Sequence, residues 1–117
     1  MTSMKVEPTI SEIVWLPDVA DGNYPAAKSY LSLIYSEETA GKLVKRLKAA
    51  KMARFKAKDI FRSSGLSLLG VSNSHVEKDR KKIQNGTALS PLLLCRDTAN
   101  GKVVIADGYH RLCAVYS

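Results

Sequence analysis

The segment 102–116 limits the possible folds of this chain most strongly, because it predicts a buried strand that runs directly into a helix. Residues 103–106, Val-Val-Ile-Ala, form the unbroken apolar run that is typical of a strand covered on both faces. Asp107-Gly108 ends that run at a glycine turn. Helical spacing of apolar side chains follows at Leu112, Val115 and Tyr116.

The start of this predicted helix has the properties of an anion-binding site. Its first main-chain N–H groups have no partner within the helix, and the helix dipole is positive at this end. Such a corner binds anions, phosphate above all. His110 and Arg111 lie in the first turn, where positive side chains are unfavourable unless a bound anion offsets them. In the structural alternative, Asp107 caps the helix, which stabilises it by about 1 kcal/mol, and His110 and Arg111 are exposed or paired with acids such as Asp97.

Length and composition indicate one folded, basic domain. The chain has 117 residues, 45% of them hydrophobic, and a formal net charge of +7. No apolar run has the length of a membrane span, and the first residues lack the pattern of a signal peptide, so we expect a cytoplasmic protein without a membrane partner. Cys95 and Cys113 have apolar neighbours and are expected to be buried thiols. Zinc-type ligand spacing is lacking, so no metal site is predicted.

Residues 1–51 are expected to form an N-terminal extension with a helical hairpin packed on the core. After a loose tail, 9–16 is predicted to be a short strand or a docking segment. Pro25 is placed at the first helical position, and Ser36 is predicted to cap the second helix. Apolar residues form one stripe on each helix, namely Ala26, Tyr30, Leu33 and Ile34 on the first and Ala40, Leu43, Val44 and Leu47 on the second.

The excess positive charge is concentrated in residues 42–62, which we call the basic tract. It contains nine basic residues against the single acid Asp59. A solvated face explains part of this density, but like charges with few partners repel each other unless a polyanion is near. Contact with DNA or RNA is therefore an alternative. The candidate nucleic-acid-binding residues are Lys42, Lys45, Lys48, Arg54, Lys56 and Lys58.

The remaining segments complete a small α/β (α+β) fold, a mixed sheet with flanking helices. Residues 52–60 are predicted to be a strand, or a strand running into a turn. Residues 91–96 are predicted to be a second buried strand, joined to the last one by a hairpin loop at 97–101. A charged helix lies between them. Its start is predicted at a capping box of Ser74 and Glu77, and its end at Asn85-Gly86.

From residue 55 onward this order of elements resembles the ParB/sulfiredoxin superfamily. In those domains the last strand-to-helix corner carries a phosphate-binding motif, which is Gly-Glu-Arg-Arg in partition proteins, Gly-Gly-Cys-His-Arg in sulfiredoxins and Asp-Gly-His-His-Arg in free-serine kinases. Residues 107–111, Asp-Gly-Tyr-His-Arg, are most similar to the last of these. The resemblance covers 52–117, which is expected to form a ParB/sulfiredoxin-like domain and a single structural unit with 1–51.

The resemblance implies that the motif contacts a nucleotide. Gly108, Tyr109, His110 and Arg111 would lie at its phosphates, and Asp107 would be a base or a metal-facing carboxylate, so that Asp107 and His110 are the catalytic candidates. The implied cofactor is a nucleoside triphosphate with magnesium. Tyr109 occupies the position of the sulfiredoxin catalytic cysteine, so sulfinic-acid reduction is not expected.

A second segment is implied to reach the same ligand. His75 and Lys78 lie where partition proteins have another nucleotide-contacting box, and they are second-rank phosphate-binding candidates.

Three functions follow from these residues. The leading hypothesis is a phosphate- or nucleotide-binding domain, with NTP-dependent phosphoryl transfer or hydrolysis as an extension. Asp107 is the only acid in the motif, which favours binding over turnover. The alternative is a nucleic-acid-binding module or regulator that uses the basic tract. A ParB-like nuclease using Asp107, His110 and His75 is third.

Overall fold

One mixed sheet forms the centre of the molecule. The structure is a computed structural model that describes residues 3–8, 13–67 and 73–116. Within these residues four strands pair in the order β2-β1-β3-β4. Strand β1 is parallel to β2 and antiparallel to β3, and β3 and β4 form an antiparallel hairpin. The strands are β1 (Ser3–Pro8), β2 (Met52–Phe55), β3 (Leu92–Asp97) and β4 (Lys102–Asp107).

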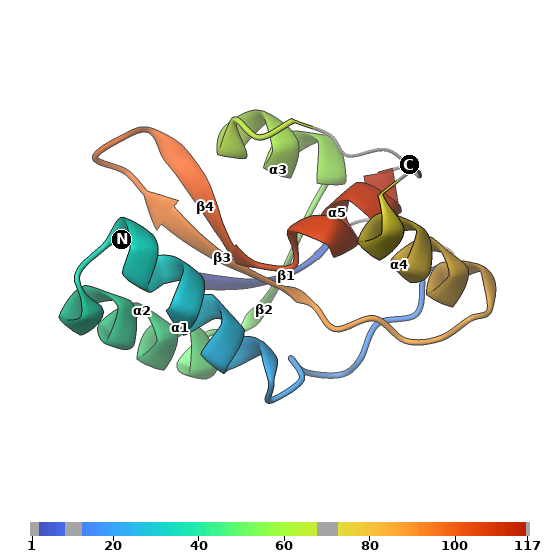
Figure 1. Cartoon of the computed structure of the whole chain (residues 1–117), viewed down its shortest axis with the longest axis horizontal. Coiled ribbons are helices and arrows are strands. Elements are labelled where there is room, and N and C mark those ends of the chain that lie inside the picture. The colour runs from blue at the N-terminus through green and yellow to red at the C-terminus, as the bar shows by residue number, and fades with distance from the viewer. Residues whose placement is uncertain (1–2, 9–12, 68–72, 117) are drawn as a thin grey trace.

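Five helices within the described residues cover the two faces of this sheet. They are α1 (Asn23–Ile34), α2 (Glu37–Ala49), α3 (Ala57–Ser64), α4 (Ser74–Gln84) and α5 (Tyr109–Tyr116). Figure 1 shows α1 and α2 on one face, α3 and α5 on the other, and α4 beside α5. A small mixed α/β architecture is therefore confirmed. None of the described helices is long and apolar enough to cross a bilayer.

Side-chain alternation along β3 divides the core into two layers. Leu93 and Cys95 pack with α1 and α2, whereas Leu92 and Leu94 pack with α3 and α5. Successive side chains of a strand point to opposite faces, so a strand covered on both faces must be apolar throughout. The burial predicted for the last two strands is confirmed, and both cysteines are free and buried.

The N-terminus differs from the prediction. Residues 3–8, expected in a loose tail, form β1 between β2 and β3, so 1–51 and 52–117 contribute to one sheet. Charged residues within this short segment hid the strand, because central strands are usually apolar throughout. Of the segment 9–16, residues 9–12 lie outside the described part, and Trp15 makes an isolated bridge to Leu89.

Helix α1 presents a different face to the core than its clearest apolar stripe suggested. It begins at Asn23, two positions before Pro25, and it buries Tyr24, Ala27 and Leu31. The predicted stripe of Ala26, Tyr30, Leu33 and Ile34 is exposed instead. Two apolar rows share this helix, and periodicity alone does not decide which row packs on the sheet.

Helix α2 follows its prediction closely. The Ser36 hydroxyl accepts a hydrogen bond from the Thr39 N–H at 3.2 Å, which caps the helix. Its predicted apolar stripe, Ala40, Leu43, Val44 and Leu47, is buried.

Two predictions of local structure after residue 51 were wrong. The strand β2 ends at Phe55, and 57–60 begin the short helix α3, because Ala57 and Ile60 are three positions apart and both bury against the sheet. Helix α4 is capped by Asn73 rather than by Ser74, since the Asn73 side-chain oxygen accepts from the N–H groups of His75 and Val76.

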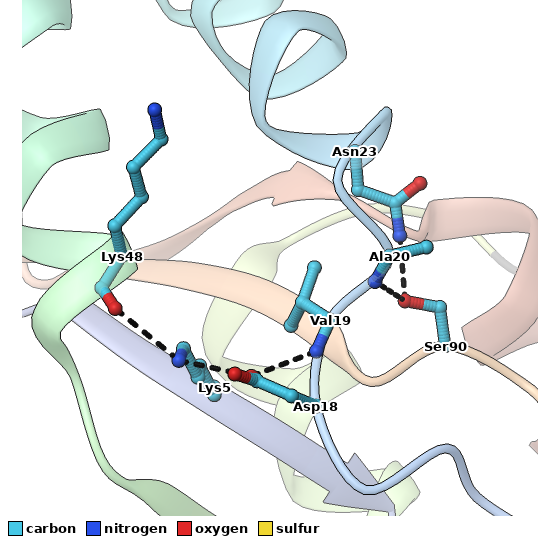
Figure 2. A network of polar contacts seen from close by, with 7 residues as sticks. All are labelled: Lys5, Asp18, Val19, Ala20, Asn23, Lys48 and Ser90. Atoms are coloured by element: carbon cyan, nitrogen blue, oxygen red, sulfur yellow. Dashed lines mark hydrogen bonds and ion pairs between the residues drawn. The ribbon is translucent and has the colours of Figure 1, made fainter.

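A buried lysine ties β1 to both the loop before α1 and the end of α2 (Figure 2). The Lys5 ammonium lies 2.9 Å from the Asp18 carboxylate and donates to the Lys48 carbonyl at 3.4 Å. Burial opposes the charge of Lys5, but Asp18 and Tyr24 more than offset it, so the pKa of Lys5 is raised. The hydrogen bond from Lys5 lowers the pKa of Asp18. The charged pair therefore fixes the loop.

The same loop is held a second time near β3. The Ser90 hydroxyl oxygen accepts from the Ala20 N–H at 3.0 Å and from the Asn23 side-chain amide at 2.7 Å (Figure 2). These contacts position the first turn of α1 over the sheet.

Candidate functional site

The corner between β4 and α5 requires glycine at position 108. Gly108 has φ +104°, a region that other residues rarely adopt. A Cβ atom there would lie 2.4 Å from Leu92 Cδ2 and 2.9 Å from Arg111 Nη2. The turn therefore brings main chain, the Leu92 side chain and the guanidinium into one tightly packed corner.

Arg111 folds back onto this corner. Its Nη2 donates to the Asp107 carboxylate at 3.0 Å and to the Pro91 carbonyl at 3.3 Å. The Arg111 and Asp107 side chains are 17% and 18% exposed. The Arg111 Nε is buried and has no hydrogen-bond partner among the described residues. Arg111 is thus anchored, with donor capacity left over.

Asp97, the acid suggested as a partner for Arg111, is used elsewhere. Its carboxylate accepts from the Tyr35 hydroxyl at 3.0 Å and from the Asn100 side-chain amide at 2.8 Å, so the pairing alternative is corrected to Asp107. The Asn100 amide lowers the pKa of Asp97, and burial together with Asp97 raises the pKa of Tyr35 to about 12. This cluster fixes the β3–β4 hairpin loop.

One face of α4 lies opposite the start of α5. Its residues recur three and four positions apart, which places them in one row along the helix: His75, Lys78, Asp79 and Lys82. The imidazole rings of His75 and His110 meet with their centroids 4.8 Å apart. The two helices thus approach each other through polar side chains at this end.

A polar cavity of about 240 Å³ lies between this row and the corner. All seven residues predicted as catalytic or phosphate-binding line it, and two residues that the sequence analysis missed complete it. Its lining consists of His75, Lys78, Asp79, Lys82, Asp107, Gly108, Tyr109, His110 and Arg111. The signal for the missed pair was spacing, since Asp79 and Lys82 each follow a predicted residue by four positions.

Charge in the cavity favours an anion. Lys78, Lys82 and Arg111 carry three positive charges against the carboxylates Asp79 and Asp107, which leaves one in excess before either imidazole is protonated. The N–H groups of the first turn of α5 add the positive end of the helix dipole. The arrangement can therefore bind a negatively charged group without a metal ion.

Tyr109 lines the cavity, and its hydroxyl has a partner outside the lining residues. The hydroxyl donates to the Ser67 carbonyl, and burial and the neighbouring Cys113 raise the pKa of Tyr109. The Tyr109 hydroxyl is therefore already used as a donor to the loop after α3.

The basic tract occupies a different part of the molecule. Its nine basic residues are all exposed and run along α2, over the edge strand β2 and onto α3. Lys42 pairs with Glu38 at 3.2 Å, and the Lys48 ammonium lies 5.6 Å from the centroid of the Tyr24 ring. Charged side chains on an edge strand also discourage pairing with another sheet. Part of the tract therefore has a structural use.

Within the described residues no group of three or more His, Cys, Asp or Glu side chains could hold a metal ion. The carboxylates of the cavity are instead matched with cations, Asp107 with Arg111 at 3.0 Å and Asp79 with Lys82 at 4.0 Å. Comparisons with family models, with curated proteins and with solved structures find no match for this chain. The resemblance to the ParB/sulfiredoxin superfamily thus stays a prediction from the motif.

Proposed function

We propose that the cavity between α4 and α5 binds the phosphate groups of a small molecule, with a nucleotide as the ligand class that the ParB/sulfiredoxin-like motif implies. One observation carries the proposal. Residues predicted from two separate segments, 75–78 and 107–111, line a single cavity with an excess of positive charge. A cytoplasmic location fits such a ligand.

In this proposal each group has a distinct task. The first main-chain N–H groups of α5 and the dipole of that helix bind a phosphate oxygen. Arg111 adds its charge at the base of the cavity, where Asp107 and the Pro91 carbonyl hold the guanidinium in place. His110 and His75 donate from the side, and Lys78 reaches the phosphates from α4.

The geometry favours binding over turnover. A general base must be free to accept a proton, whereas the Asp107 carboxylate accepts a hydrogen bond from Arg111 at 3.0 Å. Asp79 is the less tightly held acid, since its nearest cation, Lys82, is 4.0 Å away. If a nucleotide arrives with magnesium, we expect Asp79 to face the ion, because Mg²⁺ uses phosphates with one or two carboxylates.

A thermal-shift panel tests this function. Inorganic phosphate and nucleoside mono-, di- and triphosphates are added with and without magnesium, and at least one of them should raise Tm, since a ligand of the native state stabilises it. Arg111→Ala should remove the shift. Arg96→Ala, which removes an exposed arginine of β3, is the matched control and should retain it.

Because Arg111 is partly buried, its loss can also weaken the fold. Lys78→Ala provides a second variant, at an exposed position, that should reduce the shift while the Tm without ligand stays unchanged. If no phosphate compound stabilises the parent protein, the proposal is wrong.

The exposure of all nine basic residues favours nucleic-acid binding as a second candidate. A nucleic-acid-binding module would bind DNA or RNA through charges that salt screens, so its affinity should fall steeply with ionic strength. A cavity for one nucleotide should respond less. Lys45→Gln combined with Lys58→Gln should weaken this binding and leave any effect of phosphate on Tm intact. Nuclease activity would add DNA cleavage that depends on Asp107 and His110.

A further inference from the structure

Both histidines of the chain lie at the same place in the fold. The sequence contains two, and each is the second residue of its helix, His75 in α4 and His110 in α5. Their ring centroids are 4.8 Å apart, with the ring planes inclined by 40°. Both residues line the cavity between the two helices. Among the described residues neither imidazole makes a hydrogen bond or an ion pair, so the ring nitrogens are available to a ligand.

This histidine pair is the part of the cavity that can change its charge near neutral pH. Histidine is the only side chain that ordinarily titrates between about pH 5 and about pH 8. The other charged groups that face the pair are Lys78, Asp79 and Lys82 from α4, Asp107 from β4 and Arg111 from α5. Carboxylate, ammonium and guanidinium groups ordinarily titrate outside that range. Burial raises the pKa of the Tyr109 hydroxyl, which therefore stays protonated there as well.

A proton on the pair is unfavourable until an anion binds. A charged imidazole faces the other imidazole at 4.8 Å, the positive ends of two helix dipoles and the excess positive charge of the remaining lining. An anion with two charges reverses this balance, because it attracts all of these groups. Anion binding and protonation therefore favour each other, and the effect is reciprocal.

We propose that His75 and His110 couple anion binding to proton uptake. A phosphate group with two negative charges binds together with protons from the solvent, and it binds more tightly as the pH falls from about 8 to about 6. The inference rests on the phosphate site proposed above and adds how that site chooses its ligand. A terminal phosphate carries close to two negative charges at neutral pH, whereas each phosphate of a nucleic acid carries one. The histidine pair therefore selects a phosphate monoester over a phosphodiester.

Sulfate is the probe for the proton coupling, because it keeps two negative charges throughout this range while phosphate itself gains a proton. In calorimetric titrations at constant ionic strength, the parent chain should bind sulfate about five-fold more tightly at about pH 6 than at about pH 8. One added positive charge about 4 Å from the anion gives this ratio in water. The heat of binding should also differ between two buffers of different ionisation enthalpy, because the buffer supplies the protons.

Histidine variants show whether the pair is the source of this dependence. His75→Gln combined with His110→Gln removes both titrating groups and should remove the difference between the two pH values. Lys81→Gln is the matched control, because it removes a charge from α4 outside the cavity, where Lys81 lies 3.9 Å from Glu77, and it should keep the difference. Proton NMR gives a direct readout, since the parent chain has two histidines. Sulfate should move the protonation of their rings to higher pH.

Two methyl esters test the choice of ligand. Methyl phosphate should bind at about pH 7, and dimethyl phosphate, which has a single charge, should bind at least about five-fold more weakly. Equal affinities for the two esters overturn the inference and leave the phosphate site standing. A parent chain that binds sulfate equally at both pH values, without proton uptake, does the same. If neither phosphate nor sulfate binds at any pH, the proposed function itself fails and the inference falls with it.

Discussion

Lys5 and Arg111 have the same kinds of partner, but Arg111 has a hydrogen-bond donor that none of the described residues uses. Each cation pairs with one carboxylate, at 2.9 Å for Lys5 and 3.0 Å for Arg111, and each donates to one main-chain carbonyl. Lys5 joins three segments around the sheet core. Arg111 lines an open cavity and has a buried Nε without a partner among the described residues. Polar groups that only hold a fold tend to be fully paired, so unused donors beside a cavity indicate a binding role.

The largest effect should come from Gly108→Ala, which changes the corner that Arg111 shares. Its Cβ would overlap Leu92, and φ +104° strains any side chain, so we expect a loss of about 3 kcal/mol in the free energy of unfolding. Phosphate binding should be lost as well. Denaturant unfolding measures the first effect and calorimetric titration with phosphate the second.

Gly101→Ala is the matched control for this change. Gly101 also has a positive φ, +64°, but a Cβ there meets nothing within 4 Å. It should cost about 1 kcal/mol from strain alone and leave phosphate affinity intact. Equal losses in the two variants would show that Gly108 has no special role in the site.

The next largest effect should separate the two cations. Lys5→Ala removes a buried side chain, and we expect it to cost about 2 kcal/mol of stability while the phosphate affinity of the folded protein stays the same. Lys5→Met should recover most of that loss, because it restores volume and because Asp18 is exposed enough to remain hydrated. Unfolding and titration on the same samples check both. Weaker phosphate binding by Lys5→Met would contradict the division of roles.

These two regions also show what the sequence could predict. Main-chain chemistry predicted the corner between β4 and α5, because a buried strand, a glycine and a helix start fix where the first N–H groups of α5 point. The partnership of the corner with His75 and Lys78 came from the family resemblance. Residue spacing within one helix could not have predicted this partnership, because it depends on the packing of α4 on α5.

What the sequence left open has two physical causes. Strand β1 was missed because its segment looks polar. Lys5 can be buried there only because distant residues, Asp18 and the Lys48 carbonyl, pair with it. The buried face of α1 was predicted wrongly because the helix has two apolar rows with similar sequence patterns. One row packs on the sheet and the other is exposed. Long-range contacts decided both cases.

A smaller effect should appear in the pH dependence of stability. The pKa of Asp18 lies below its ordinary 3.8, so its contribution is complete above that pH and is lost as the pH falls through the folded-state value. The pKa of Lys5 lies above 10.5, so its contribution is complete below 10.5 and is lost as the pH rises further. Asp18→Asn should therefore flatten the acid side of a plot of unfolding free energy against pH. Asp21→Asn, in the same loop, controls for the change in net charge.

The smallest effect should come from Lys82→Gln, which tests whether a lysine that lines the cavity contributes more to phosphate binding than a lysine elsewhere on the surface. Lys82 lines the cavity but lies 4.0 Å from Asp79, so its charge is shared. Removing one charge about 4 Å from a phosphate in water costs about 1 kcal/mol, which corresponds to an affinity for phosphate about five-fold weaker. Lys45→Gln removes the same charge from the basic tract and should change phosphate affinity by much less, because that residue lies on α2, away from the cavity. Equal effects of the two variants in calorimetric titration would mean that net charge, and not the cavity, governs phosphate binding.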